Sequence, residues 1–151
     1  MEKILLAVDD SKKAENAAEK AGEIAAALEA EVTILTVVDA DNIQYSAEAA
    51  QSQLLAKLME ERKNEAKQHG EKILNKTENI IKSFQKDKDI EINKLLSSGK
   101  PAEYICEEAG KNGYDLIILA DTGEGGVKRF LLGSTSDRVV RHADTSVMIV
   151  K

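Results

Sequence analysis

The chain has 151 residues, the length of a single domain, and 42% hydrophobic and 32% charged residues are typical of a globular fold. The formal net charge of −6 argues against a nucleic-acid partner, which needs a basic face, and against binding to an anionic membrane surface. Cys106 is the single cysteine, and neither a signal-peptide pattern nor a membrane-spanning run occurs, so we expect a cytoplasmic location.

The first forty residues predict two buried strands with a helix between them. The continuous apolar run at 3–8 predicts a strand that is buried on both faces. Alanines at helical spacing follow over 11–30, and Ser11 or Asp10 is the expected N-cap. The β-branched run at 31–39 predicts the second strand.

A long helical segment is predicted over about 49–85, after a polar loop at 40–48. Its middle is strongly polar, which predicts that this part either projects into solvent or bends near Gly70. Its apolar side is formed by Leu54, Leu55, Leu58, Ile73, Leu74, Ile80, Ile81 and Phe84.

The second half continues the alternation of strands and helices. Strands are predicted at 89–98, 114–120 and 145–151, and helices at 99–113 and 134–143. Pro101 lies near the start of the first of these helices, and Gly113 lies at its end. This alternation predicts one α/β domain over residues 1–151, with a parallel sheet and right-handed crossovers.

A glycine-rich stretch between the fourth strand and the last helix is the strongest candidate for a binding site. Gly123 and Gly133 could leave backbone amides free for phosphate oxygens, and the helix dipole favours an anion beside Ser134 and Thr135. Ser134 and Asp137 also match a capping box. The residues alone leave two interpretations open, a phosphate cradle or an ordinary connection that leads into a well-capped helix.

Two common nucleotide motifs are absent. The turn after the first strand contains no glycine, so it is not a G-x-G-x-x-G dinucleotide fingerprint, and no G-x-x-x-x-G-K-[ST] P-loop occurs. His69 is expected to be solvated, His142 to interact with a helix C-terminus, and Cys106 to be a small buried residue, so no metal site is predicted.

The spacing of the glycines resembles that of the universal stress protein family. Members typically carry G-x-x-G, nine residues and then G-[ST], and here Gly123, residues 124–132 and Gly133-Ser134 reproduce the second part. The first glycine of the pattern is replaced by Ala120. The resemblance covers nearly the whole chain, and residues 40–90 are the least constrained.

This resemblance implies a fold and a ligand. The fold is a three-layer sandwich, with a five-stranded parallel sheet of order 3-2-1-4-5 and helices on both faces. The ligand is ATP, or AMP or ADP, with or without Mg²⁺, across the carboxyl ends of the first and fourth strands. The implied binding residues are Ala7, Val8, Asp9, Val37, Leu119, Ala120, Gly123, Gly133, Ser134 and Thr135.

Ala120 is the departure that decides whether this site is retained. An alanine would interfere where the glycine it replaces has a positive φ or touches the ligand. We therefore expect nucleotide binding if the backbone at Ala120 is extended, and only a connecting loop if it needs a positive φ.

The expected function is that of a cytoplasmic stress-response protein that acts through nucleotide occupancy and is not an enzyme. The resemblance also implies a homodimer formed through the C-terminal edge strand, besides an unknown protein partner. The alternative is a nucleotide-free interaction protein that acts through its dimer surface and its long helix.

Overall fold

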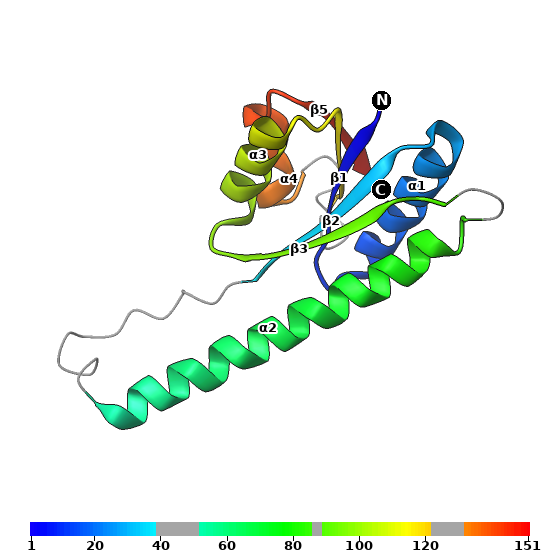
Figure 1. Cartoon of the computed structure of the whole chain (residues 1–151). Helices are drawn as coiled ribbons and strands as arrows, with labels where there is room; N and C mark the ends of the chain where they lie inside the picture. Colours follow the sequence, from blue (N-terminus) through cyan, green and yellow to red (C-terminus); the bar gives the residue numbers. More distant parts are fainter. Residues whose placement is uncertain (39–51, 86–88, 122–131) are drawn as a thin grey trace.

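The computed structural model describes residues 1–38, 52–85, 89–121 and 132–151 (Figure 1). Five parallel strands form one sheet in the order β3-β2-β1-β4-β5. The strands are β1 (Lys3–Ala7), β2 (Glu31–Val38), β3 (Ile92–Ser98), β4 (Leu116–Ala120) and β5 (Ser146–Val150). The helices are α1 (Lys12–Leu28), α2 (Gln53–Lys82), α3 (Pro101–Asn112) and α4 (Ser134–His142). The predicted fold class and strand order are confirmed.

The sheet is buried on both faces because successive side chains of a strand point to opposite sides. Within β1, Ile4 and Leu6 pack with the α1 and α2 side of the core, whereas Leu5 packs with the α3 and α4 side. The register aligns Leu6 with Ile34 of β2 and with Ile118 of β4, so the central strands bury matching apolar positions. The result is the three-layer arrangement of Figure 1, with two helices on each face.

Helix α1 packs closely because its buried face consists of small residues. Of the two predicted candidates, Ser11 and not Asp10 is the N-cap, and its hydroxyl accepts a hydrogen bond from the amide of Ala14 at 3.1 Å. Gly22 lies against Ile81 of α2 and against Phe84, which comes just after that helix. Helices α1 and α2 therefore approach closely. The buried face of α1 consists of Ala14, Ala17, Ala18, Ala21, Gly22 and Ala25.

Helix α2 has 30 residues and is about 45 Å long. It runs without interruption through Gly70, and its N-terminal half extends beyond the sheet (Figure 1). Of the two alternatives for its polar middle, projection into solvent is therefore confirmed. Its buried residues all lie in the C-terminal half: Gly70, Ile73, Leu74, Thr77 and Ile81.

Gly70 is the point at which α2 meets the edge of the sheet. A Cβ at this position would lie 3.0 Å from Cγ1 of Val38, and closer still to Cδ1 of Leu96. The glycine therefore permits close packing on β2 and β3 and does not bend the helix.

Candidate functional site

A cavity of about 300 Å³ lies at the carboxyl ends of β1, β2 and β4, beside the N-terminal ends of α3 and α4. Ligands of open parallel sheets bind at this end of the strands. The cavity brings together these predicted site residues: Ala7, Val8, Asp9, Val37, Leu119, Ala120, Ser134 and Thr135. Gly133 directly precedes Ser134 as the N-cap of α4, and Gly123 lies outside the described residues.

One wall of the cavity is apolar. Val37 and Leu35 are two residues apart in β2 and so share a face, and Leu119 of β4 belongs to the same side of the core. Pro101 and Ile105 add the first turns of α3. The sequence analysis did not name Leu35. Side chains two residues apart in a strand lie on the same face, so a strand that places Val37 in the cavity wall also places Leu35 there. The sequence analysis also missed Ala14, Pro101, Ile105 and Ser136, which come from neighbouring helices.

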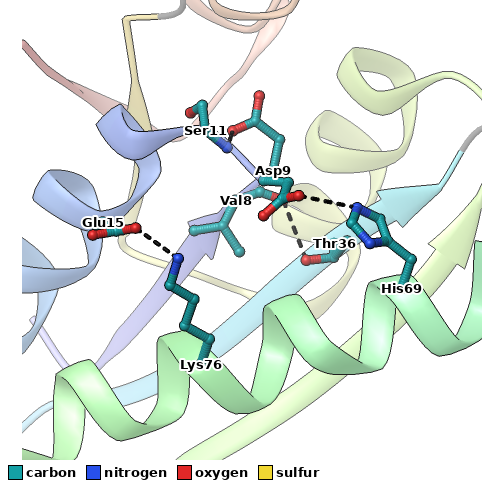
Figure 2. A network of polar contacts seen from close by, with 8 residues as sticks. Val8, Asp9, Ser11, Glu15, Thr36, His69 and Lys76 are labelled. Carbon is teal, nitrogen blue, oxygen red and sulfur yellow. Dashed lines mark hydrogen bonds and ion pairs between the residues drawn. The ribbon is translucent and has the colours of Figure 1, made fainter.

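Asp9 contributes the one ionisable side chain among the described residues that line this cavity. It is exposed, and its Oδ1 accepts a hydrogen bond from the amide of Ser11 at 3.0 Å (Figure 2). The residue before Asp9 is Val8, and both its backbone amide and its backbone carbonyl are hydrogen-bonded to β2. The amide of Val8 donates to the Leu35 carbonyl at 2.9 Å, and the buried hydroxyl of Thr36 donates to the Val8 carbonyl at 3.2 Å. The backbone that leads into Asp9 is therefore held in place by hydrogen bonds to β2.

The start of α4 forms a second wall, and its capping differs from the prediction. Gly133 is the N-cap, in an extended conformation, and within the described part of the chain the start of α4 has no side-chain cap hydrogen bond. The predicted capping box is wrong because Ser134 is already the first helical residue and the Asp137 carboxylate binds Nε of Arg141 at 2.9 Å. An uncapped helix start leaves its first amides available to an anion.

Ser136 holds this helix start in place. Its buried hydroxyl donates to the carbonyl of Ala120 at 2.9 Å, which ties the first turn of α4 to the end of β4. Ser134 and Thr135, which also carry hydroxyl groups, line the same cavity. The wall thus combines a fixed serine with two hydroxyl groups that can face a ligand.

Ala120 has the extended conformation on which nucleotide binding was expected to depend. It is the last residue of β4 and pairs with Val150 of β5. Among the described residues other than glycine, only Glu29 has a positive φ, so the φ of Ala120 is negative. Alanine is therefore accommodated here without backbone strain, and its methyl group is buried in the core.

The remaining candidates lie away from the cavity. His69 is exposed but does not stand alone, because its Nε2 lies 3.3 Å from Oδ2 of Asp10. Cys106 is half-buried between α3 and α4, and burial, with a smaller effect of Asp144, raises the pKa of its thiol. A raised pKa makes this thiol a poor nucleophile.

The described part of the chain contains neither a metal-ligand cluster nor a membrane-spanning helix. No group of three or more His, Cys, Asp or Glu side chains there is placed to hold a metal ion. No helix in the same residues combines the length and the apolar character that crossing a membrane requires.

Comparison with known proteins finds similarity to members of one protein family. The model of the family described as the universal stress protein family matches residues 1–151. Universal stress protein MJ0531 of Methanocaldococcus jannaschii is 32% identical over 149 residues, which cover 99% of this chain and 81% of that protein.

Solved structures share the fold. Universal stress protein UspA from Lactobacillus plantarum is 27% identical, with a TM-score of 0.72 and coverage of 99% of this chain and 97% of that chain. The universal stress protein from Archaeoglobus fulgidus in complex with dAMP is 19% identical, with a TM-score of 0.69 and coverage of 100% and 98%.

Proposed function

The chain belongs to the universal stress protein family, and from this premise we propose that it binds an adenine nucleotide in the cavity beside Asp9 and Ser134. The observation that carries the proposal is the chemistry of two walls of the cavity. One wall is apolar and ends in a carboxylate, and the other is the start of α4, which has no side-chain cap hydrogen bond among the described residues.

Each part of a nucleotide has a matching surface in this cavity. The apolar side chains of Leu35, Val37 and Leu119 suit the flat, apolar face of a purine. The second carboxylate oxygen of Asp9, Oδ2, can accept hydrogen bonds from a ribose hydroxyl or an adenine amino group. Phosphates fit at Ser134 and Thr135, where hydroxyls and first-turn amides donate and the helix dipole favours negative charge.

The fold match to the dAMP complex does not carry this proposal, because 19% identity supports the fold alone. The support comes from the cavity and from Ala120, whose extended backbone removes the objection that the missing glycine raised. ATP, AMP and ADP all contain the groups that the two walls can recognise. Any Mg²⁺ would enter with the phosphates, because no cluster of protein ligands occurs among the described residues.

We further propose that the protein acts through nucleotide occupancy in a cytoplasmic stress response and does not turn over a substrate. Asp9 is the one ionisable group in the described lining, and one of its oxygens already accepts the Ser11 amide. A homodimer through β5 is part of the proposal, since β5 lies at the edge of the sheet and is apolar. Sedimentation at the mass of one 16.5 kDa chain would contradict the dimer.

A second candidate function is that of a nucleotide-free interaction protein. It is favoured by the projecting half of α2, where Leu54 and Leu58 are 68% and 47% exposed. Such a protein would use α2 and the dimer surface and would leave the cavity without a nucleotide.

Thermal unfolding with and without nucleotide separates the two candidates. At a nucleotide concentration of about 100 times Kd we expect stabilisation by about 2.7 kcal/mol, which raises Tm by about 5–10 °C in a domain of this size. No shift with millimolar ATP, ADP or AMP, with and without Mg²⁺, would reject nucleotide binding.

Ser134→Ala tests the position of the phosphates. It removes a hydroxyl donor to a charged group, so we expect affinity to fall about tenfold or more in calorimetric titration while the fold is kept. Ser146→Ala is the matched control, because Ser146 is exposed at the start of β5, at the opposite end of the strands. Equal losses in the two variants would reject the assigned site.

A further inference from the structure

The turn between β1 and α1, which carries Asp9, is held by α2 on the side away from the cavity. His69 Nε2 lies 3.3 Å from Oδ2 of Asp10, and Lys76 Nζ lies 2.6 Å from Oε1 of Glu15 in the first turn of α1 (Figure 2). His69 and Lys76 are seven residues apart, so they lie two helical turns from each other on the same face of α2. Two contacts from one helix thus reach the turn itself, at Asp10, and the first turn of α1 that follows it, at Glu15.

Buried residues of α2 also lie beside the turn. A hollow of only about 10 Å³ lies between the turn and α2, and Asp9, Asp10, Ile73 and Thr77 contribute to its lining. Ile73 and Thr77 are buried residues of α2. Asp9 therefore borders the cavity on one side and the surface of α2 on the other.

The charges of this region explain why the turn needs a partner. It brings three acidic side chains close together, those of Asp9, Asp10 and Glu15, beside a site proposed to receive phosphates. The hydrogen bond with Lys76 lowers the pKa of Glu15, and the same bond raises the pKa of Lys76, with a smaller contribution from Asp10. Lys76 is thus the cation of α2 that balances this acidic turn, and Lys12 of α1 adds a weaker effect on Glu15.

We infer that Lys76, assisted by His69, is a positioning residue for the nucleotide site, and that α2 and the nucleotide are energetically coupled through the β1–α1 turn. The inference rests on the proposed function. If Lys76 holds the turn in the geometry that presents Asp9, occupancy of the cavity must in return favour the docked position of α2, because coupling between two sites is reciprocal. Nucleotide binding would then be sensed by the helix whose other half projects from the domain.

A charge-reversal cycle at Lys76 and Glu15 tests the positioning role. Lys76→Glu and Glu15→Lys should each weaken AMP binding about two- to fivefold, the range expected for an exposed ion pair. The double variant restores opposite charges and should return to within about twofold of the wild-type affinity. Affinities are measured by calorimetry well below the Tm of each variant, so that loss of folded protein does not imitate loss of binding.

Lys94→Glu is the matched control, because it reverses the charge at a different ion pair of the same helix, α2. Lys94 of β3 pairs with Glu78 of α2 at 2.7 Å, so its reversal disturbs α2 without touching the turn. AMP affinity should stay at the wild-type value in this variant. Equal weakening in Lys94→Glu and Lys76→Glu would show a general effect of loosening α2 and would overturn the positioning role.

Hydrogen exchange tests the reciprocal effect. AMP should slow amide exchange over residues 69–76 of wild-type α2 at least about twofold, and this protection should be lost in Lys76→Glu. If the wild-type protein binds AMP but amide exchange in α2 is not slowed, the inference is overturned and the proposed function stands. The same holds if the double variant binds AMP as weakly as the single variants. Absence of AMP binding to the wild-type protein would instead reject the proposed function, and the inference with it.

Discussion

The two halves of α2 belong to one continuous helix but lie in different surroundings. From Gly70 onwards the helix buries Ile73, Leu74 and Ile81 against the core, whereas the part before Gly70 carries Leu54 and Leu58 in exposed positions. Both halves contain leucine or isoleucine at helical spacing, so the apolar pattern alone does not distinguish them. The difference arises from what each half meets in the fold, since most helix stability in proteins comes from packing.

The largest expected effect separates the halves directly. Ile81 is fully buried, so Ile81→Ala should lower the free energy of unfolding by about 2–5 kcal/mol. Leu54→Ala removes a side chain that is 68% exposed and should change stability by about 0.5 kcal/mol or less. Urea denaturation of the two variants measures the contrast, and equal costs would mean that the projecting half is packed in solution.

A smaller effect is expected at the boundary between the halves. Gly70→Ala places a methyl group against Leu96 and Val38, so we expect a loss of about 1–3 kcal/mol. Gly110→Ala in α3 is the matched control, because a Cβ there meets nothing within 4 Å. In that helix alanine should stabilise the protein by about 0.5–1 kcal/mol. Stabilisation by both substitutions, measured in the same urea titrations, would contradict close contact at Gly70.

The smallest effect concerns pH. Hydrogen bonds from Lys82 and Lys94 lower the pKa of Glu78, in the packed half of α2, below its ordinary value. A depressed carboxyl pKa contributes stability that is present above the unfolded pKa of about 4.3 and is lost as the pH falls through the folded value. Because the group is partly solvated, we expect about 0.5 kcal/mol or less.

Glu78→Gln checks this pH effect. The variant should be slightly less stable than the wild type at pH 7, and the difference should shrink between about pH 5 and pH 3. Urea denaturation at both ends of this range measures it. A difference that does not change with pH would mean that Glu78 acts through packing and not through its charge.

The sequence predicts the fold well because the strands carry strong local signals. The uninterrupted apolar runs of β1 and β4, the Ser11 cap and the Pro101 start of α3 each depend on neighbouring residues only, and all are confirmed. The strand order came from the resemblance to the family and agrees with the structure.

The features that the sequence did not reveal, one wrong prediction among them, depend on contacts between residues distant in the chain. The cap of α4 could not be assigned from Ser134 and Asp137 alone, because Ser136 binds the carbonyl of Ala120 and the chain enters the helix one residue earlier. The pairing of His69 with Asp10 joins residues 59 positions apart, and no local pattern indicates it. The extended state of Ala120 follows from its pairing with Val150, which again only the folded sheet reveals.

The bond between Ser136 and Ala120 has a consequence for how this protein could be altered. The amide of Asp121 also donates to the Val150 carbonyl at 2.8 Å, so the strand end and the helix start that flank residues 122–131 are anchored by the framework itself. We therefore expect that a substitution within residues 122–131 leaves these two hydrogen bonds, and with them the framework that presents Ser134 and Thr135, intact.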